Sequence, residues 1–136
     1  MRNAKKLEYG FSNEEFEIRL QRAQELLYEN KLDALLITIP SNLRYFTGID
    51  TNFWESPTRP WFLVVPLSGS PIAVIPEIAE NLFKKTFVKD IHAWPSPNFN
   101  GDDISPLKSL LESLPSRFGA IGAELGKEMS IRMSVL

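Results

Sequence analysis

The 136-residue sequence contains no cysteine, so it has no disulfide, no thiol nucleophile and no thiolate-bound metal. It also lacks a long apolar run. Every hydrophobic stretch falls far short of the roughly 20 residues that cross a bilayer. The first ten residues have no apolar core, so we expect no secretory signal. These absences predict a soluble, cytoplasmic protein with no membrane partner.

An excess of one charge is missing as well. The 15 Lys and Arg residues nearly balance the 17 Asp and Glu residues, which leaves a net charge of −2 and no electrostatic footprint for nucleic acid. Hydrophobic residues make up 43% of the chain and charged residues 24%, as in ordinary globular proteins. We therefore expect one folded domain over residues 1–136, with no nucleic-acid partner.

Catalytic groups are scarce. The only histidine, His92, lies near Asp90 in a strand-like stretch with no nucleophile in view, so a surface or internally satisfied histidine is favoured. The pair Asp102-Asp103 fits a turn followed by a helix cap. A metal site would rest on one histidine and scattered carboxylates without ligand spacing. The residues predict a domain with no catalytic apparatus and no metal of its own.

Hydrophobic periodicity indicates alternating helices and strands. A helix is predicted over residues 11–31, with a capping box of Ser12 and Glu15 and a hydrophobic staple of Phe11 and Phe16. Strands are predicted at residues 33–39, 61–65, 72–75, 88–94 and 119–125, and further helices at 78–87, at 104–114 and from 126 onward. The short 67–71 turn makes two strands antiparallel, so the sheet is mixed. Prolines 71 and 76 predict that the 72–75 strand is short or at an edge.

The stretch from Ser41 to Pro66 is the expected place of substrate contact. Ser41 is predicted to cap a short helical turn that Gly48 ends. The apolar run at residues 61–65 predicts a strand buried on both faces. Between them lies a loop that contains Phe53, Trp54, Glu55 and Arg59 and is stiffened by Pro57 and Pro60. Loops held on rigid elements commonly carry binding residues.

The segment Asn42-Leu-Arg-Tyr-Phe-Thr-Gly48, with residues 32–38 before it, resembles a signature of the N-terminal domain of the creatinase/prolidase ("pita-bread") superfamily. The opening helix with Arg19, the Leu63–Pro66 strand and the late strand at residues 119–126 follow in the family's order. The resemblance covers nearly the whole chain. It implies a three-layer α/β/α domain with a mixed sheet of about five to six strands in a ribonuclease-H-like arrangement.

In that family the domain precedes a C-terminal catalytic domain, which would be the main partner of this chain. Two Asp, one His and two Glu of the catalytic domain bind a pair of divalent metal ions, often manganese, cobalt or zinc. The resemblance places none of these ligands in this chain, which we expect to be a fragment that ends inside an element at Leu136. Creatinase uses the same fold without metal, so the metal dependence of the parent enzyme stays open.

The resemblance also implies a homodimer in which this domain of one subunit reaches the active site of the other. Arg59, in Thr58-Arg59-Pro60, would bind a substrate carboxylate, as an arginine after glycine does in creatinase. Trp54 would form an aromatic wall of the substrate site, with Phe53 beside it. The alternatives are that Trp54 is buried against its own domain or the dimer partner, and that Arg59 is solvated or forms a surface pair with Glu55 or Asp50.

Our leading interpretation is the non-catalytic N-terminal domain of a dimeric Xaa-Pro peptidase-like metallohydrolase, which shapes the substrate site and the dimer contacts. The substrate would be a peptide or a small acid. One alternative is the corresponding domain of a small-molecule amidohydrolase of the ectoine hydrolase or creatinase type. Another is a free-standing binding module.

Overall fold

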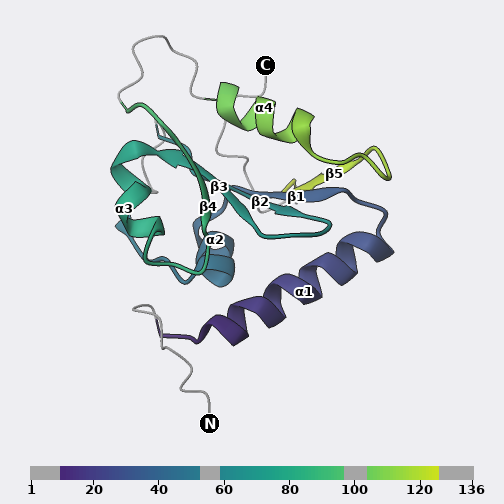
Figure 1. Cartoon of the computed structure of the whole chain (residues 1–136), viewed down its shortest axis with the longest axis horizontal. Coiled ribbons are helices and arrows are strands. Elements are labelled where there is room, and N and C mark those ends of the chain that lie inside the picture. The colour runs from purple at the N-terminus through teal and green to yellow at the C-terminus, as the bar shows by residue number, and fades with distance from the viewer. Residues whose placement is uncertain (1–9, 53–58, 97–103, 126–136) are drawn as a thin grey trace.

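The computed structural model describes residues 10–52, 59–96 and 104–125, which form a layered α/β domain (Figure 1). Its elements in chain order are α1 (Asn13–Glu29), β1 (Ala34–Ile37), α2 (Pro40–Thr47), β2 (Phe62–Pro66), β3 (Ile72–Pro76), the 3-10 helix η2 (Glu77–Ala79), α3 (Glu80–Phe83), β4 (Asp90–Trp94), α4 (Ser105–Ser113) and β5 (Ile121–Ala123). The predicted helix from residue 126 and the predicted Asp102-Asp103 cap lie outside the described residues.

The described strands form one five-stranded mixed sheet in the order β4-β3-β2-β1-β5. The pairs β1–β2 and β2–β3 are antiparallel, whereas β1–β5 and β3–β4 are parallel. The prediction of an edge position for β3 is wrong, because β3 lies between β2 and β4. Its prolines are tolerated there because Pro71 precedes the strand and Pro76 lies beyond the residues that pair with β2.

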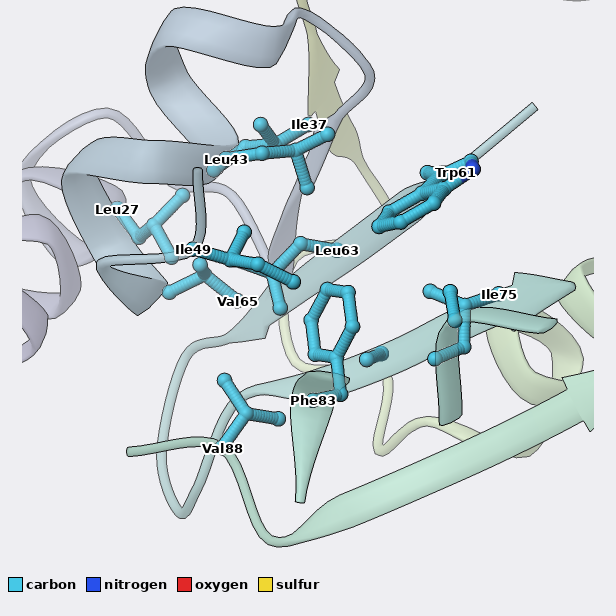
Figure 2. Packing of buried hydrophobic residues seen from close by; sticks show 12 residues of the cluster. Leu27, Ile37, Leu43, Ile49, Trp61, Leu63, Val65, Ile75, Phe83 and Val88 are labelled. Atoms are coloured by element: carbon cyan, nitrogen blue, oxygen red, sulfur yellow. The ribbon is translucent and has the colours of Figure 1, made fainter. Parts of the chain in front are cut away.

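Helices cover both faces of the sheet, as Figure 1 shows for α1 and α4. Leu63 and Val65 of β2 pack into a cluster with residues of α1, α2 and α3, part of which is drawn in Figure 2. Phe62 and Val64 point the opposite way, into a second cluster with α4. All five residues of β2 are buried, which confirms the predicted strand covered on both faces and the α/β/α class.

Helix α1 begins at Asn13 with the predicted cap Ser12, but only one of the two hydrogen bonds of the predicted capping box forms. The Ser12 hydroxyl accepts a hydrogen bond from the Glu15 N–H at 3.3 Å, and the rings of Phe11 and Phe16 meet edge to face with centroids 6.2 Å apart. The Glu15 carboxylate accepts a hydrogen bond from Arg19 Nε at 2.9 Å. The hydrophobic staple is confirmed, and the i,i+4 pair of Glu15 and Arg19 stabilises α1.

Helix α2 begins two residues earlier than predicted. Ile39 is the N-cap and Pro40 the first helical residue, so the prediction that Ser41 caps the helix is wrong. Proline suits this position because its fixed φ is helical and it has no N–H to satisfy. The predicted end is correct. Gly48 adopts the left-handed conformation with φ 78°, and its N–H donates to the Arg44 carbonyl at 2.7 Å.

Across the described residues, no helix combines the length and the apolar character that a membrane crossing requires.

Candidate functional site

The segment after α2 is the candidate site, and a carboxylate from the far end of the chain holds the start of that helix. Glu124, which directly follows β5, accepts hydrogen bonds at Oε2 from the backbone N–H groups of Thr38 at 2.7 Å and Ile39 at 2.9 Å. The Thr38 hydroxyl donates to the same oxygen at 3.2 Å. Oε1 accepts from Asn42 Nδ2, in the first turn of α2. One side chain thus satisfies the backbone between β1 and α2.

The position of Glu124 also suits the electrostatics of the helix. The N-terminal end of a helix carries partial positive charge from its unpaired N–H groups, so a carboxylate there is stabilising. The N-cap residue Ile39 has no side-chain oxygen to offer. Glu124, which is distant in the sequence, therefore supplies the hydrogen-bond acceptor that a local Ser or Asp cap usually supplies.

The other end of α2 is held by a guanidinium. Arg19 of α1 donates from Nη1 to the Tyr45 carbonyl at 2.7 Å, in the last turn of α2. Its guanidinium carbon lies 4.5 Å from the Phe11 ring centroid and 4.6 Å from that of Tyr45. Only 13% of the Arg19 side chain is exposed. A cation beside the last carbonyls of a helix is favourable, so both ends of α2 meet the charge that complements them.

The α2–β2 loop, residues 49–60, begins and ends on fixed points. At its start, the Thr47 hydroxyl donates to the Leu43 carbonyl at 2.7 Å and accepts from the Ile49 N–H at 3.1 Å, and Ile49 is fully buried. At its end, Trp61 is buried with its ring centroid 5.7 Å from that of Phe83. The described ends of the loop are therefore anchored in the core.

The predicted site residues fall in or beside this loop. Arg59 is half-buried three residues before β2, whereas Phe53, Trp54 and Glu55 lie outside the described residues. Asp50 forms an exposed ion pair with Arg44, with 3.5 Å between the nitrogen and oxygen atoms. Among the residues that the structure describes, no carboxylate lies within ion-pair distance of Arg59, so the Asp50 alternative for this arginine is wrong.

The groups that could do acid–base or metal chemistry do not converge. His92 is exposed on the edge strand β4, where Nε2 lies 3.0 Å from Asp90 Oδ1, which confirms the predicted surface histidine. Within residues 10–52, 59–96 and 104–125, no three side chains of His, Cys, Asp or Glu gather as metal ligands. The described part of the chain therefore does not fit a pair of metal ions.

A second anchored carboxylate lies at the opposite end of the β1–β5 pair. Asp33, only 6% exposed, accepts hydrogen bonds from the N–H groups of Arg117, Phe118 and Gly119 at 2.8–2.9 Å. The Phe118 N–H contributes most to holding the pKa of Asp33 below its ordinary value of 3.8, against the effect of burial. Sequence reasoning missed both Asp33 and Glu124. The available signal was a lone acidic residue bordering each apolar strand.

A shallow hollow of about 460 Å³ lies between α1 and the turn that joins β2 to β3. Arg117 stacks there on the Tyr28 ring at 5.0 Å, and Glu25 and Glu29 line the same hollow. Its charges are of both signs and its lining is largely exposed, so it offers no convergent set of catalytic groups.

The fold and the site together define an α/β domain that presents an anchored loop. Residues 19–134 match the model of the creatinase/prolidase N-terminal domain, and the chain belongs to this family. A comparison with curated proteins gave no match.

Solved structures of dipeptidases share the fold. A dipeptidase, PepE, from Mycobacterium ulcerans is 26% identical, with a TM-score of 0.60, over 78% of this chain and 28% of that protein. A proline dipeptidase from Streptococcus pneumoniae is 21% identical with a TM-score of 0.60, over 78% of this chain and 73% of that one. The creatinase/prolidase N-terminal domain of an X-Pro dipeptidase from Streptococcus pyogenes is 17% identical with a TM-score of 0.61, over 79% and 76%. The chain thus spans little more than a quarter of the Mycobacterium ulcerans dipeptidase.

Proposed function

We propose that this chain is the non-catalytic N-terminal domain of a dipeptidase-like hydrolase that acts on Xaa-Pro substrates. The observation that carries the proposal is the match of residues 19–134 to the creatinase/prolidase N-terminal domain. The scattered acid–base groups of the described residues support a non-catalytic role. In this proposal the chemistry, and any pair of manganese, cobalt or zinc ions that it needs, belongs to a C-terminal catalytic domain.

The first test separates the chain from its proposed catalytic partner. The 136-residue chain, incubated with Ala-Pro and manganese, should give no hydrolysis above buffer. The protein that continues into the catalytic domain should cleave Ala-Pro and other Xaa-Pro dipeptides. Cleavage of ectoine or creatine in place of dipeptides would support the small-molecule alternative and contradict the proposal. Turnover that purifies with the 136-residue chain would contradict the non-catalytic role.

Within this proposal Arg59 binds the substrate carboxylate, and Trp54 with Phe53 forms an apolar wall beside it. The support from the structure is that Arg59 directly precedes Pro60, close to the anchored strand β2, and the residue before a proline is restricted to extended backbone. A planar guanidinium held in this way suits bidentate recognition of a carboxylate. Preorganisation of the loop lowers the entropy lost on binding.

Replacing Arg59 tests this role in the full-length enzyme. Arg59→Ala should weaken kcat/KM by about 1.5–3 kcal/mol, the scale of a charged hydrogen bond. Arg59→Lys should restore only part of the loss, because an ammonium cannot make the paired contact. Arg22→Ala, which removes an exposed arginine of α1, is the control and should leave kcat/KM unchanged. Equal effects of Arg59→Ala and Arg22→Ala would contradict a substrate contact.

We further propose that the loop acts across a homodimer. Mixed dimers would pair an Arg59→Ala subunit with a subunit that lacks a catalytic-domain metal ligand. If Arg59 acts in the opposite subunit, the intact metal site, which belongs to the Arg59→Ala subunit, receives Arg59 from the other subunit and should keep near wild-type activity, whereas the Arg59→Ala homodimer stays impaired. Activity per intact metal site as low as in the Arg59→Ala homodimer would show instead that Arg59 acts within its own subunit.

A further inference from the structure

Helix α2 is too short to be stable by its own hydrogen bonds. Its eight residues span about 12 Å, and helices below about 12 residues are marginal in water. Two contacts from distant parts of the chain fix its ends, Glu124 at the start and Arg19 at the finish. In so short a helix, loss of order at one end reaches the other, because the whole element is only about two turns long.

We propose that Glu124 and Arg19 are positioning residues, which hold α2 so that the chain leaves Gly48 in one orientation and the α2–β2 loop starts from a fixed place. The part that concerns substrate rests on the proposed function, because it assumes that this loop meets substrate. Neither residue needs to touch substrate. Each acts through the helix, and the buried Ile49 N–H that bonds to Thr47 reports on its last turn.

The contact between Glu124 and Asn42 can be tested by an exchange of groups. Oε2 of Glu124 accepts the backbone N–H groups while Oε1 faces the Asn42 amide. Asn42→Asp sets two carboxylates against each other. In the double variant Asn42→Asp with Glu124→Gln, the glutamine oxygen can still accept from the backbone and its amide can donate to the new aspartate. The double variant should therefore recover the contact at the start of α2 that Asn42→Asp loses.

The first measurement is amide hydrogen exchange of the 136-residue chain. Asn42→Asp should accelerate exchange at Gly48 and Ile49 about tenfold, and the double variant should return it to within about twofold of the original protein. Asp33→Asn is the matched control, since it disturbs an equally bonded carboxylate at the other end of the same strand pair. Its local effect should centre on residues 117–119 and leave Gly48 and Ile49 nearly unchanged.

Two results would overturn the proposal. One is equal acceleration at Gly48 and Ile49 in Asn42→Asp and Asp33→Asn, because general loss of stability would then explain it. The other is failure of the double variant to recover. If Asn42→Asp does not fold, Arg19→Lys makes the same measurement from the other end of α2. A lysine can donate to the Tyr45 carbonyl but cannot lie flat between two rings, so exchange at Gly48 should still accelerate.

The second measurement is steady-state kinetics of the full-length protein on an Xaa-Pro dipeptide. Asn42→Asp should raise KM about fivefold with kcat within about twofold, since only loop placement changes, and the double variant should restore KM. Asp33→Asn should leave both parameters unchanged while the protein is folded. If exchange at Gly48 responds and KM does not, the positioning role stands and the proposed substrate contact of the loop is wrong.

Discussion

The parallel pair of β1 and β5 carries an anchored carboxylate at each end, and the two differ in what they hold. Asp33 binds three N–H groups of the turn that leads into β5. Glu124 binds the link between β1 and α2 and also the first turn of α2 itself. The same chemistry closes a turn at one end of the pair. At the other end it holds the helix from which the candidate loop begins.

The difference shows that the number of hydrogen bonds alone does not distinguish the carboxylate next to the candidate loop from the other one. Asp33 is more buried and accepts from three backbone groups, yet Arg59, the predicted site residue that the structure describes, precedes β2 at the opposite end of the β1–β2 pair. Glu124 is half-buried, and the helix that it holds leads directly into the loop that contains Arg59. What separates the two carboxylates is the element that each one fixes.

The central strand sets the scale against which both carboxylates are compared. Leu63→Ala removes a fully buried side chain from β2 and should lower the free energy of unfolding by about 2–5 kcal/mol. Ile121→Ala, on the edge strand β5 and 42% exposed, should cost much less. Urea denaturation of the 136-residue chain measures both. A larger loss from Ile121→Ala would mean that the stability of the domain depends on its edge and not on its centre.

Removing the Glu124 side chain should come next in size. Glu124→Ala leaves the N–H groups of Thr38 and Ile39 without their acceptor and should cost about 1–3 kcal/mol. Glu112→Ala, which removes an exposed carboxylate from α4, should change the stability by no more than about 0.5 kcal/mol. Denaturant midpoints at neutral pH give the comparison. Equal midpoints for the two variants would show that the hydrogen bonds of Glu124 contribute nothing to the stability of the fold.

The smallest expected effect is a pH dependence that belongs to Asp33. Its pKa in the folded protein lies below the ordinary 3.8, so the unfolded chain takes up the proton first as the pH falls. The stability that the ionised carboxylate contributes is present above pH 3.8 and is lost as the pH falls through the folded pKa. Asp33→Asn should therefore melt below the original protein at neutral pH, and the gap should narrow in acid.

Melting curves of both proteins between neutral and acidic pH measure this gap. Asp90→Asn, an exposed carboxylate on the edge strand, is the control for general acid destabilisation. A gap that stays constant across the acid range would show that the charge of Asp33 does not contribute.

Much of the fold could be predicted because its signals are local. The helical spacing of apolar residues in α1, its Ser12 cap and the unbroken apolar run of β2 each lie within a few residues of sequence, and each is confirmed. The start of α2 was misjudged because its cap is not local. Glu124 lies 82 residues from Asn42 in the sequence, and no pattern near Ser41 predicts that a carboxylate binds the start of this helix.

The two ends of the candidate loop were predictable, whereas its role in binding stays a prediction. The ending of α2 at Gly48 and the entry into β2 frame the loop as expected, since glycine and apolar runs act locally. The roles of Arg59, Trp54 and Phe53 come from family resemblance and remain predictions. The two residues that fix the helix before the loop, Arg19 and Glu124, could not be assigned from sequence, because their partners are set by the tertiary fold.

The parallel pairing of β1 with β5 also has a consequence for the order of folding. The groups that close both ends of β1 lie 82 to 86 residues further along the chain than the groups they bind. During synthesis, β1 and α2 therefore leave the ribosome long before the segment that completes them. Contacts between such distant segments form slowly, because the chain must first close a long loop. Until β5 pairs with β1, one edge of β1 is open to any other strand. Aggregation during refolding at high concentration should therefore begin at this edge.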